Sequence, residues 1–247
     1  MAESMVEVGM AGNNRLGDKV RVGTTAECAK TFLQMAENFR SAGGWTSANV
    51  ERNDKTLTLF NLLAASVNYL DMAAKNIEEH ISAIALATRS LYEINLQARD
   101  IPRSSDSLLR WQGEAVTDKI QVLEGILGLE TSSAMPEQRK VLLTEVDRLL
   151  SLRKKYGLPD ARPSGAGEIA KSAGLAKEHS ALFKLFSKLI HLSSYLINDY
   201  KNAASNETAM ILQIHAQLYA WDTFRLICDA VSMPESARRK LESAPGS

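Results

Sequence analysis

The sequence has few cysteines and no excess of either charge. Lys plus Arg and Asp plus Glu number 29 each among 247 residues, which argues against bulk electrostatic attraction to nucleic acid or to anionic lipid. The two cysteines, Cys28 and Cys228, lie far apart in apolar surroundings and lack the spacing of a metal site. We therefore expect both thiols to be buried and reduced, which suits the reducing cytoplasm.

Long apolar runs and strand patterns are also absent from the sequence. No segment approaches the roughly 20 apolar residues that a membrane-spanning helix needs. The N-terminal segment lacks the apolar core of a signal peptide. Alternating runs of Val, Ile and Thr between turn residues, which are typical of strands, are missing as well. The sequence thus predicts a cytoplasmic protein with no membrane association and no sheet.

The short motifs of the common enzyme classes are missing too. The sequence has no glycine-rich phosphate loop, no HExxH, no CxxC and no GxSxG elbow. These absences exclude most nucleotide-binding, metalloprotease and hydrolase families, and they predict neither a cofactor nor a metal ion. They leave open a helical enzyme that uses a few dispersed side chains.

The segment from Lys55 to Asp100 has helical periodicity and contains neither glycine nor proline. Its apolar residues recur at spacings of three and four, which is typical of a helix with one buried face. Such a helix would be well above the usual length, so we expect either one long helix or two with a bend near His80. Pro102 ends the segment, because proline disfavours a helical residue before it.

Capping residues and helix breakers predict the other helices. Thr24 and Glu27 form a capping-box pattern, and the helix that they begin is expected to run to about Arg40 and to end at Gly43-Gly44. Further helices are expected at about 105–127, 133–157, 168–173, 175–200 and 207–231, the last of them capped by Asn206.

These elements predict an all-α fold, a single bundle of six to eight helices with long central helices. Residues 1–22 are expected to form a flexible N-terminal arm, because they are rich in Gly, Asn and Met without any period. Residues 23–233 form the bundle, and residues 234–247 form a charged tail.

Two of the predicted helices carry polar side chains that are capable of chemistry. Arg89 and Glu93 lie four residues apart in one helix, and Lys188 and His191 lie three apart in the other, so each pair shares a helical face. Ser187, one turn before His191, is placed to orient one ring nitrogen. A neutral imidazole can act as a general base near pH 7. Three of these side chains, Arg89, Glu93 and His191, would alternatively form a buried polar network that fixes helix register.

The two motifs resemble those of an uncharacterised bacterial all-helical family. The motifs are Arg-x-x-x-Glu at residues 89–93 and Ser-Lys-x-x-His-x-Ser at residues 187–193, and the resemblance covers about residues 55–200. Such proteins are similar in turn to the HEPN superfamily, helical bundles common in toxin and phage-defence loci. That resemblance implies a metal-independent ribonuclease that acts as a homodimer and needs no cofactor.

The sequence therefore supports two hypotheses about function, which belong to different classes. In the first, the protein cleaves RNA or another phosphoester: His191 takes a proton from a ribose hydroxyl, Arg89 and Lys188 stabilise charge on the phosphate, and Glu93 positions Arg89. In the second, the protein is a non-catalytic interaction or regulatory module, antitoxin-like or a scaffold. Its working surface would be an apolar helix face at Ile211–Ile227 that binds a partner helix or a second copy.

Overall fold

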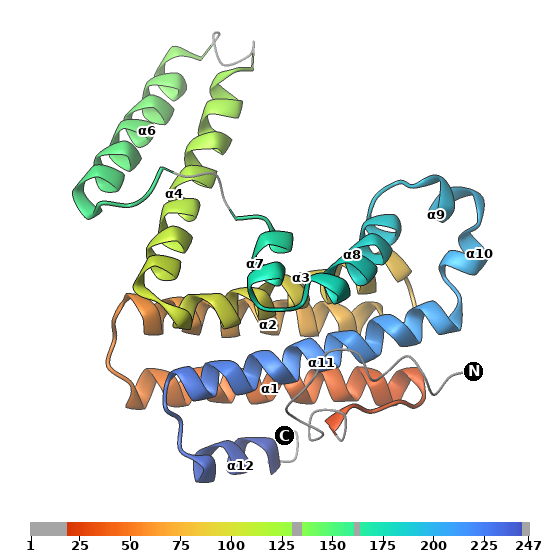
Figure 1. Ribbon diagram of the computed structural model, residues 1–247. Coiled ribbons are helices and arrows are strands. Elements are labelled where there is room, and N and C mark those ends of the chain that lie inside the picture. The colour runs from red at the N-terminus through yellow and green to blue at the C-terminus, as the bar shows by residue number, and fades with distance from the viewer. Residues whose placement is uncertain (1–18, 130–134, 161–163, 244–247) are drawn as a thin grey trace. The chain divides into compact units, whose positions relative to one another are not determined.

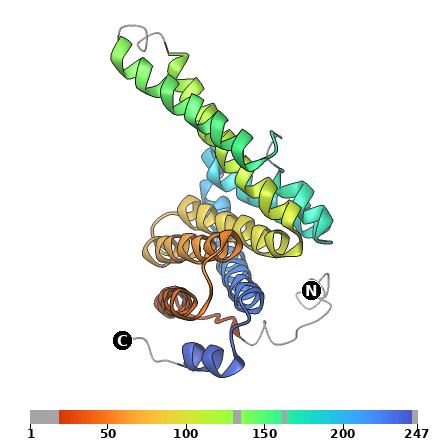
Figure 2. The same ribbon diagram turned by 90° about the vertical axis from the view of Figure 1, so that its left-hand side faces the viewer.

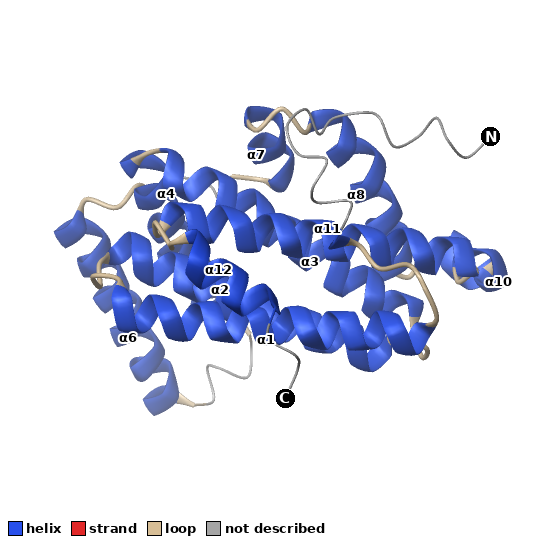
Figure 3. Cartoon of the chain, turned by 90° about the horizontal axis from the view of Figure 1, so that it is seen from below, coloured by secondary structure: helices blue, strands red, loops and turns tan. Residues whose placement is uncertain are grey.

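A computed structural model describes residues 19–129, 135–160 and 164–243, and in these ranges the chain is all-α, as predicted (Figures 1 and 3). No strand occurs in these ranges. The helices are α1 (Thr25–Asn49), α2 (Asp54–Asn76), α3 (Ile81–Asp100), the 3-10 turn η2 (Ile101–Arg103), α4 (Ser105–Leu127), α6 (Pro136–Tyr156), α7 (Ala166–Ser172), α8 (Ala176–Ile190), α9 (Ser194–Asn198), α10 (Tyr200–Ala203), α11 (Asn206–Ala230) and α12 (Glu235–Ser243).

The chain divides into two compact units. The first contains the residues up to Arg99 and those from Ala166 onwards, and the second is Asp100–Gly165. The predicted flexible arm, residues 1–22, lies for the most part outside the described residues. The predicted domain boundaries stay predictions.

Local capping explains where the first helices begin. The side chain of Thr24 accepts from the backbone N–H of Glu27 (3.3 Å), and Glu27 accepts from the backbone N–H of Thr24 (2.7 Å), so the predicted capping box is confirmed. Asn53 and Thr56 form a second capping box at the start of α2. The helices therefore begin where the sequence supplies partners for the free N–H groups of their first turns.

The predicted helix end at Gly43-Gly44 is wrong, because α1 continues to Asn49. Gly43 is buried in the middle of α1, and a Cβ placed there would lie 3.3 Å from the ring of Phe60 on α2. The missing side chain therefore lets α1 and α2 approach closely. A packing requirement, not a chain break, accounts for this glycine.

Of the two alternatives for this segment, the structure shows two helices with an interruption near His80. The helical segment after Lys55 is interrupted at 77–80 and resumes as α3 at Ile81. It ends as α3 at Asp100, directly before the 3-10 turn that contains Pro102. By length and hydropathy, α2 is the one described helix that passes the test for a membrane span, and half of its most apolar window is buried.

The core of the first unit lies between α1, α2, α3 and α11. Its largest fully buried side chains come from all four helices and include Phe32, Phe39, Leu59, Leu63, Ile84, Leu91, Tyr92 and Phe224. The two thiols, Cys28 and Cys228, are also buried, and neither forms a disulfide, as predicted. Burial of this apolar surface is the main force that holds the four helices together.

The second unit is a helical hairpin of α4 and α6 (Figure 2). Lys119 on α4 bridges Glu145 on α6 (2.5 Å), and Arg153 donates to the hydroxyl of Thr117 (2.9 Å), which fixes an antiparallel register. Gly157 ends α6, where the sequence predicted the end of this helix, and it adopts the left-handed conformation (φ 61°) that favours glycine.

Candidate functional site

Arg89 and Glu93 form the ion pair that their spacing predicts. Arg89 Nε lies 2.9 Å from Glu93 Oε1 on the same face of α3, and both side chains are partly exposed. The Arg89 guanidinium also lies 4.4 Å above the centre of the Phe183 ring on α8. The partner that another helix supplies is thus an aromatic face, which attracts a cation through its quadrupole.

The predicted continuous helix at 175–200 is wrong, and this changes the position of His191. Helix α8 ends at Ile190, and His191 adopts extended backbone angles (φ −88°, ψ 155°). Ser193 stabilises the break, because its hydroxyl donates to the carbonyl of Lys188 (2.7 Å) and accepts from the N–H of Leu196 (3.1 Å) at the start of α9. The helical-face argument for His191 therefore fails.

Lys188 and His191 are both exposed. In the part of the chain that the structure describes, neither side chain forms a hydrogen bond, ion pair or ring contact with Arg89 or Glu93. The four residues predicted as catalytic are thus brought together only in part: Arg89 and Glu93 pair on α3, and Lys188 and His191 at the end of α8 do not contact them.

His179, not His191, is the histidine beside the α3 pair. Its ring stacks on Phe183 with centroids 4.6 Å apart, and its Nδ1 lies 3.1 Å from the hydroxyl of Tyr92. Burial lowers the pKa of His179 below its usual value, although the negative charge of Glu93 opposes this shift. The imidazole is therefore neutral near pH 7. The spacing of His179, Phe183 and Phe186, four and three residues apart, was the sequence signal for this position.

Two buried tyrosines extend this cluster towards α11. Tyr219 donates to Glu178 (2.8 Å), and its ring lies 4.9 Å from that of Tyr92. Burial, and secondarily the charge of Glu178, raises the pKa of both phenols. Both hydroxyls consequently stay protonated, so they serve as hydrogen-bond donors and not as bases. We refer to Arg89, Tyr92, Glu93, Glu178, His179, Phe183 and Tyr219 as the α3–α8 cluster.

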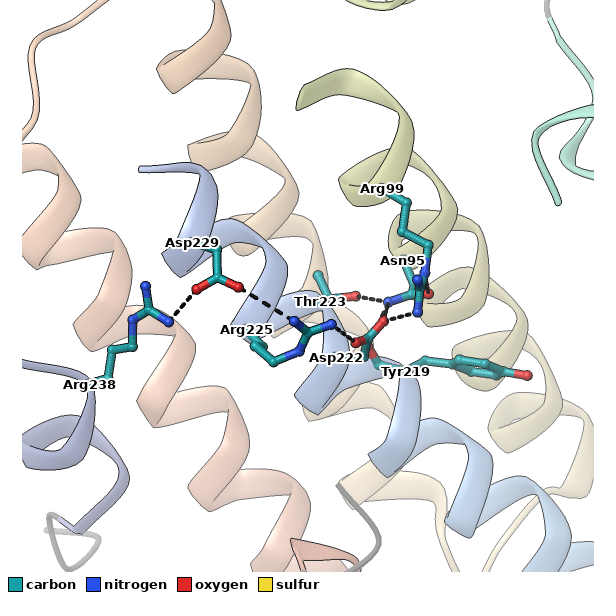
Figure 4. A network of polar contacts seen from close by, with 8 residues as sticks. All are labelled: Asn95, Arg99, Tyr219, Asp222, Thr223, Arg225, Asp229 and Arg238. Carbon is teal, nitrogen blue, oxygen red and sulfur yellow. Dashed lines mark hydrogen bonds and ion pairs between the residues drawn. The ribbon is translucent and has the colours of Figure 1, made fainter. Parts of the chain in front are cut away.

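A second polar network lies on the other side of Tyr219 and is centred on Asp222 (Figure 4). The buried Asp222 carboxylate accepts from Asn95 (2.9 Å) and Arg225 (2.8 Å), and it forms an ion pair with Arg99. Arg225 in turn bridges to Asp229, which pairs with Arg238 on α12. Opposite charges therefore alternate along the network, and it joins α3, α11 and α12.

The Asp222 network was not found from the sequence, because its members are far apart in the chain. Asn95 and Arg99 lie more than 120 residues from Asp222 and give no local pattern. The network satisfies a buried carboxylate with three donors, which is the usual requirement for a buried charge. It fits a structural role.

The predicted partner face at Ile211–Ile227 stays a prediction. Much of this stretch of α11 is buried inside the first unit, including Leu212, Tyr219, Phe224 and Ile227. Ile211, near the N-terminal end of the helix, is exposed.

A hollow of about 510 Å³ lies elsewhere in the first unit, lined by residues 19–35 and Trp221. None of the four residues predicted as catalytic lines it. Among the described residues, no group of three or more His, Cys, Asp or Glu side chains has the arrangement of a metal site.

Comparison with known proteins gives no relative: no family model matches the chain, and no curated protein or solved structure matches it.

Proposed function

We propose that the protein is a helical interaction module that works through its second unit, rather than a ribonuclease that works through His191. The observation that carries this proposal is the large number of apolar side chains that are exposed on the α4–α6 hairpin. These are Leu109, Val122, Ile126 and Leu129 on or just after α4, and Met135, Val141, Leu143, Leu150 and Tyr156 on or next to α6.

The hairpin buries little apolar surface of its own. Within the described part of Asp100–Gly165, the large apolar side chains that are buried are Ile101, Ile120 and Leu149. A helix pair needs a further layer to cover its second face, because most of the stability of a helix in a protein comes from packing. Large exposed apolar patches are typical of sites that bind other proteins.

The α3–α8 cluster supports the same proposal. Arg89 is held by Glu93 and Phe183, and the Tyr92 side chain that contacts His179 is fully buried. A network with these contacts fixes the register of α3 against α8, which is the structural role that a satisfied polar cluster performs.

Site-specific photo-crosslinking in the native cell tests the proposal. We expect a benzoylphenylalanine at position 122, in place of Val122, to form a covalent adduct with a protein partner. The same group in place of Gln121, the exposed neighbour on α4, serves as the matched control and should form less adduct. If neither position forms a protein adduct while the variant is folded, the hairpin is not an interaction surface and the proposal is wrong.

A second candidate function, phosphoester cleavage, is favoured by one observation. A neutral imidazole, His179, and a partly exposed guanidinium, Arg89, stack on the same Phe183 ring. Purified protein is incubated with single-stranded RNA in the absence of metal ions. Cleavage that is lost in His179→Gln and in Arg89→Gln supports this function with His179 as the base. Loss in His191→Gln and Lys188→Gln instead supports the assignment made from the sequence, and no cleavage by the parent protein refutes both.

A further inference from the structure

We propose that the hollow beside Trp221 binds a small organic anion that has a planar ring. The hollow encloses about 510 Å³, which lies within the range of pockets that hold small organic ligands, roughly 300–1,000 Å³. The residues that line it belong to the first unit, so the inference does not depend on the function proposed for the second unit. It follows from the way the wall is held in place, from its charge and from its apolar part.

Three segments of the first unit form the wall of the hollow. One face of α1 supplies residues from Glu27 to Met35 that recur every three or four positions. The chain before α1 supplies residues between 19 and 22, and α11 supplies Trp221. Helices α1 and α11 lie side by side in the first unit (Figure 1). The hollow is therefore bounded on two sides by helices that also build the core.

A buried glutamine holds the segment before α1 in place. The Gln217 side chain on α11 is fully buried, accepts from the backbone N–H of Arg21 (2.8 Å) and donates to the backbone carbonyl of Arg21 (2.9 Å). The amide thus uses both its oxygen and its nitrogen, as a buried polar group must. Because these bonds involve only backbone atoms of Arg21, they fix this side of the hollow and leave the Arg21 guanidinium available to a ligand.

The wall of the hollow carries more positive than negative charge. Lys19, Arg21 and Lys30 line it, and Glu27 is the one acidic side chain among the described residues that do so. Within the described ranges of the chain, the Arg21 guanidinium and the Lys30 ammonium form no hydrogen bond or ion pair. Cations that line a concave site and lack partners attract an anion to it.

Glu27 does not act as the counter-ion of these two cations. One of its carboxylate oxygens accepts from the backbone N–H (2.7 Å) and the hydroxyl (2.8 Å) of Thr24, and these hydrogen bonds hold the pKa of Glu27 below its usual value. Its negative charge is therefore directed to the N-terminal end of α1, where the helix dipole is positive. Arg21 and Lys30 alone outnumber it.

The apolar part of the wall indicates what else the ligand contains. Trp221 and Met35 line the hollow with large apolar surfaces, and the Trp221 ring is supported by the ring of Phe224, whose centre lies 6.0 Å away at nearly a right angle. A planar ring in the ligand would pack against these side chains. Its acidic group would then bind Arg21 and Lys30 through charge-assisted hydrogen bonds.

Phosphate and carboxylate groups both fit this description, because the guanidinium fork binds either of them with two parallel hydrogen bonds. The chemistry that they share is a planar ring with one such group attached. The test therefore uses one probe of each kind: AMP, a purine with a phosphate, and indoleacetate, an indole with a carboxylate.

The first test is isothermal titration calorimetry of the full chain with these probes. We expect at least one of the two anions to bind with a dissociation constant below about 1 mM. Its uncharged counterpart, adenosine or indoleacetamide, and its ring-free counterpart, inorganic phosphate or acetate, should bind at least about tenfold more weakly. The anion that binds identifies the acidic group. Failure of both anions to bind, or equally tight binding of a counterpart, overturns the inference.

The second test locates the bound anion. The double variant Arg21→Gln/Lys30→Gln should raise the dissociation constant by at least about tenfold, because it removes both uncommitted cations and keeps the backbone that Gln217 binds. Arg52→Gln/Lys75→Gln removes the same two charges from exposed positions of the same unit outside the hollow and should raise it by less than about threefold.

Far-UV circular dichroism of both double variants checks that the helices are retained. Equal weakening in the two double variants would show that the anion responds only to the total charge of the protein. Unchanged affinity in Arg21→Gln/Lys30→Gln would show that the anion binds elsewhere. Either result overturns the assignment of the hollow as the binding site.

Discussion

The contribution of the Asp222 network to stability can be predicted, and Asp229 on the same helix provides an internal control. Asp222 and Asp229 lie seven residues apart on α11, and each pairs with two arginines. Only 3% of the Asp222 side chain is exposed, compared with 49% for Asp229. Replacing each aspartate with alanine therefore removes the same chemical group from two environments that differ in burial.

The expected losses differ severalfold. Removing one member of a buried ion pair costs about 3–5 kcal/mol, chiefly because the remaining charge is left uncompensated. Arg99 and Arg225 are partly exposed, so water will solvate some of the charge that they leave, and the lower end, about 3 kcal/mol, is expected for Asp222→Ala. Asp229→Ala breaks exposed pairs and should cost less than about 1 kcal/mol.

Urea unfolding measures both losses, provided that the signal comes from one unit. Trp45 and Trp221 belong to the first unit and Trp111 belongs to the second, so tryptophan fluorescence in a Trp111→Phe background reports on the first unit alone. Equal losses in Asp222→Ala and Asp229→Ala would refute the argument that burial gives the network its weight. A loss of less than about 1 kcal/mol for Asp222→Ala would refute the same argument.

Two further predictions concern the second unit and the α3–α8 cluster. A Cβ at Gly113 would lie 2.7 Å from the backbone oxygen of Pro159, so Gly113→Ala should destabilise the second unit by about 1–3 kcal/mol. Gly125 lies on the same helix with open space around it, so Gly125→Ala should stabilise the unit by up to about 1 kcal/mol. Thermal unfolding followed by Trp111 fluorescence, with Trp45 and Trp221 replaced by Phe, distinguishes the two variants. The pKa of His179 lies below 6.5 in the folded state, so the unfolded chain binds more protons and stability should fall as the pH drops below about 6.5 towards that lowered pKa. Urea midpoints at neutral and mildly acidic pH should show a smaller fall for His179→Gln than for the parent, and an equal fall in the two proteins would contradict the argument.

Helix boundaries with a local chemical cause could be predicted from the sequence. Three such boundaries lie where they were expected: the capping pair Thr24 and Glu27, the helix end before Pro102 and the helix end at Gly157. Each depends on neighbours within a few residues. Gly43 was misjudged, because its cause is the close approach of Phe60 from another helix. A glycine that serves packing cannot be told from a glycine that ends a helix without knowledge of the neighbour.

From the sequence, the contacts of the candidate site could be predicted only where both residues lie on the same helix. The Arg89–Glu93 pair follows from a spacing of four, and it formed. The break after Ile190 was missed, because it contains neither glycine nor proline and depends on the two hydrogen bonds of Ser193. Asp222 and its partners on α3 were missed since their contacts join residues more than 120 positions apart.

The first unit is assembled from two stretches of chain, with the whole hairpin unit between them. The side chain of Gln217 on α11 binds the backbone of Arg21, 196 residues earlier, through two hydrogen bonds. During synthesis, α1, α2 and α3 leave the ribosome well before α11. The apolar surface that these helices bury against α11 is therefore uncovered until the last quarter of the chain has been made. Helices α1 and α2 are made consecutively and pack against each other, so they can pair early, but their faces towards α11 stay exposed until that helix is made. The early helices are therefore the part of the chain most in need of a chaperone during synthesis.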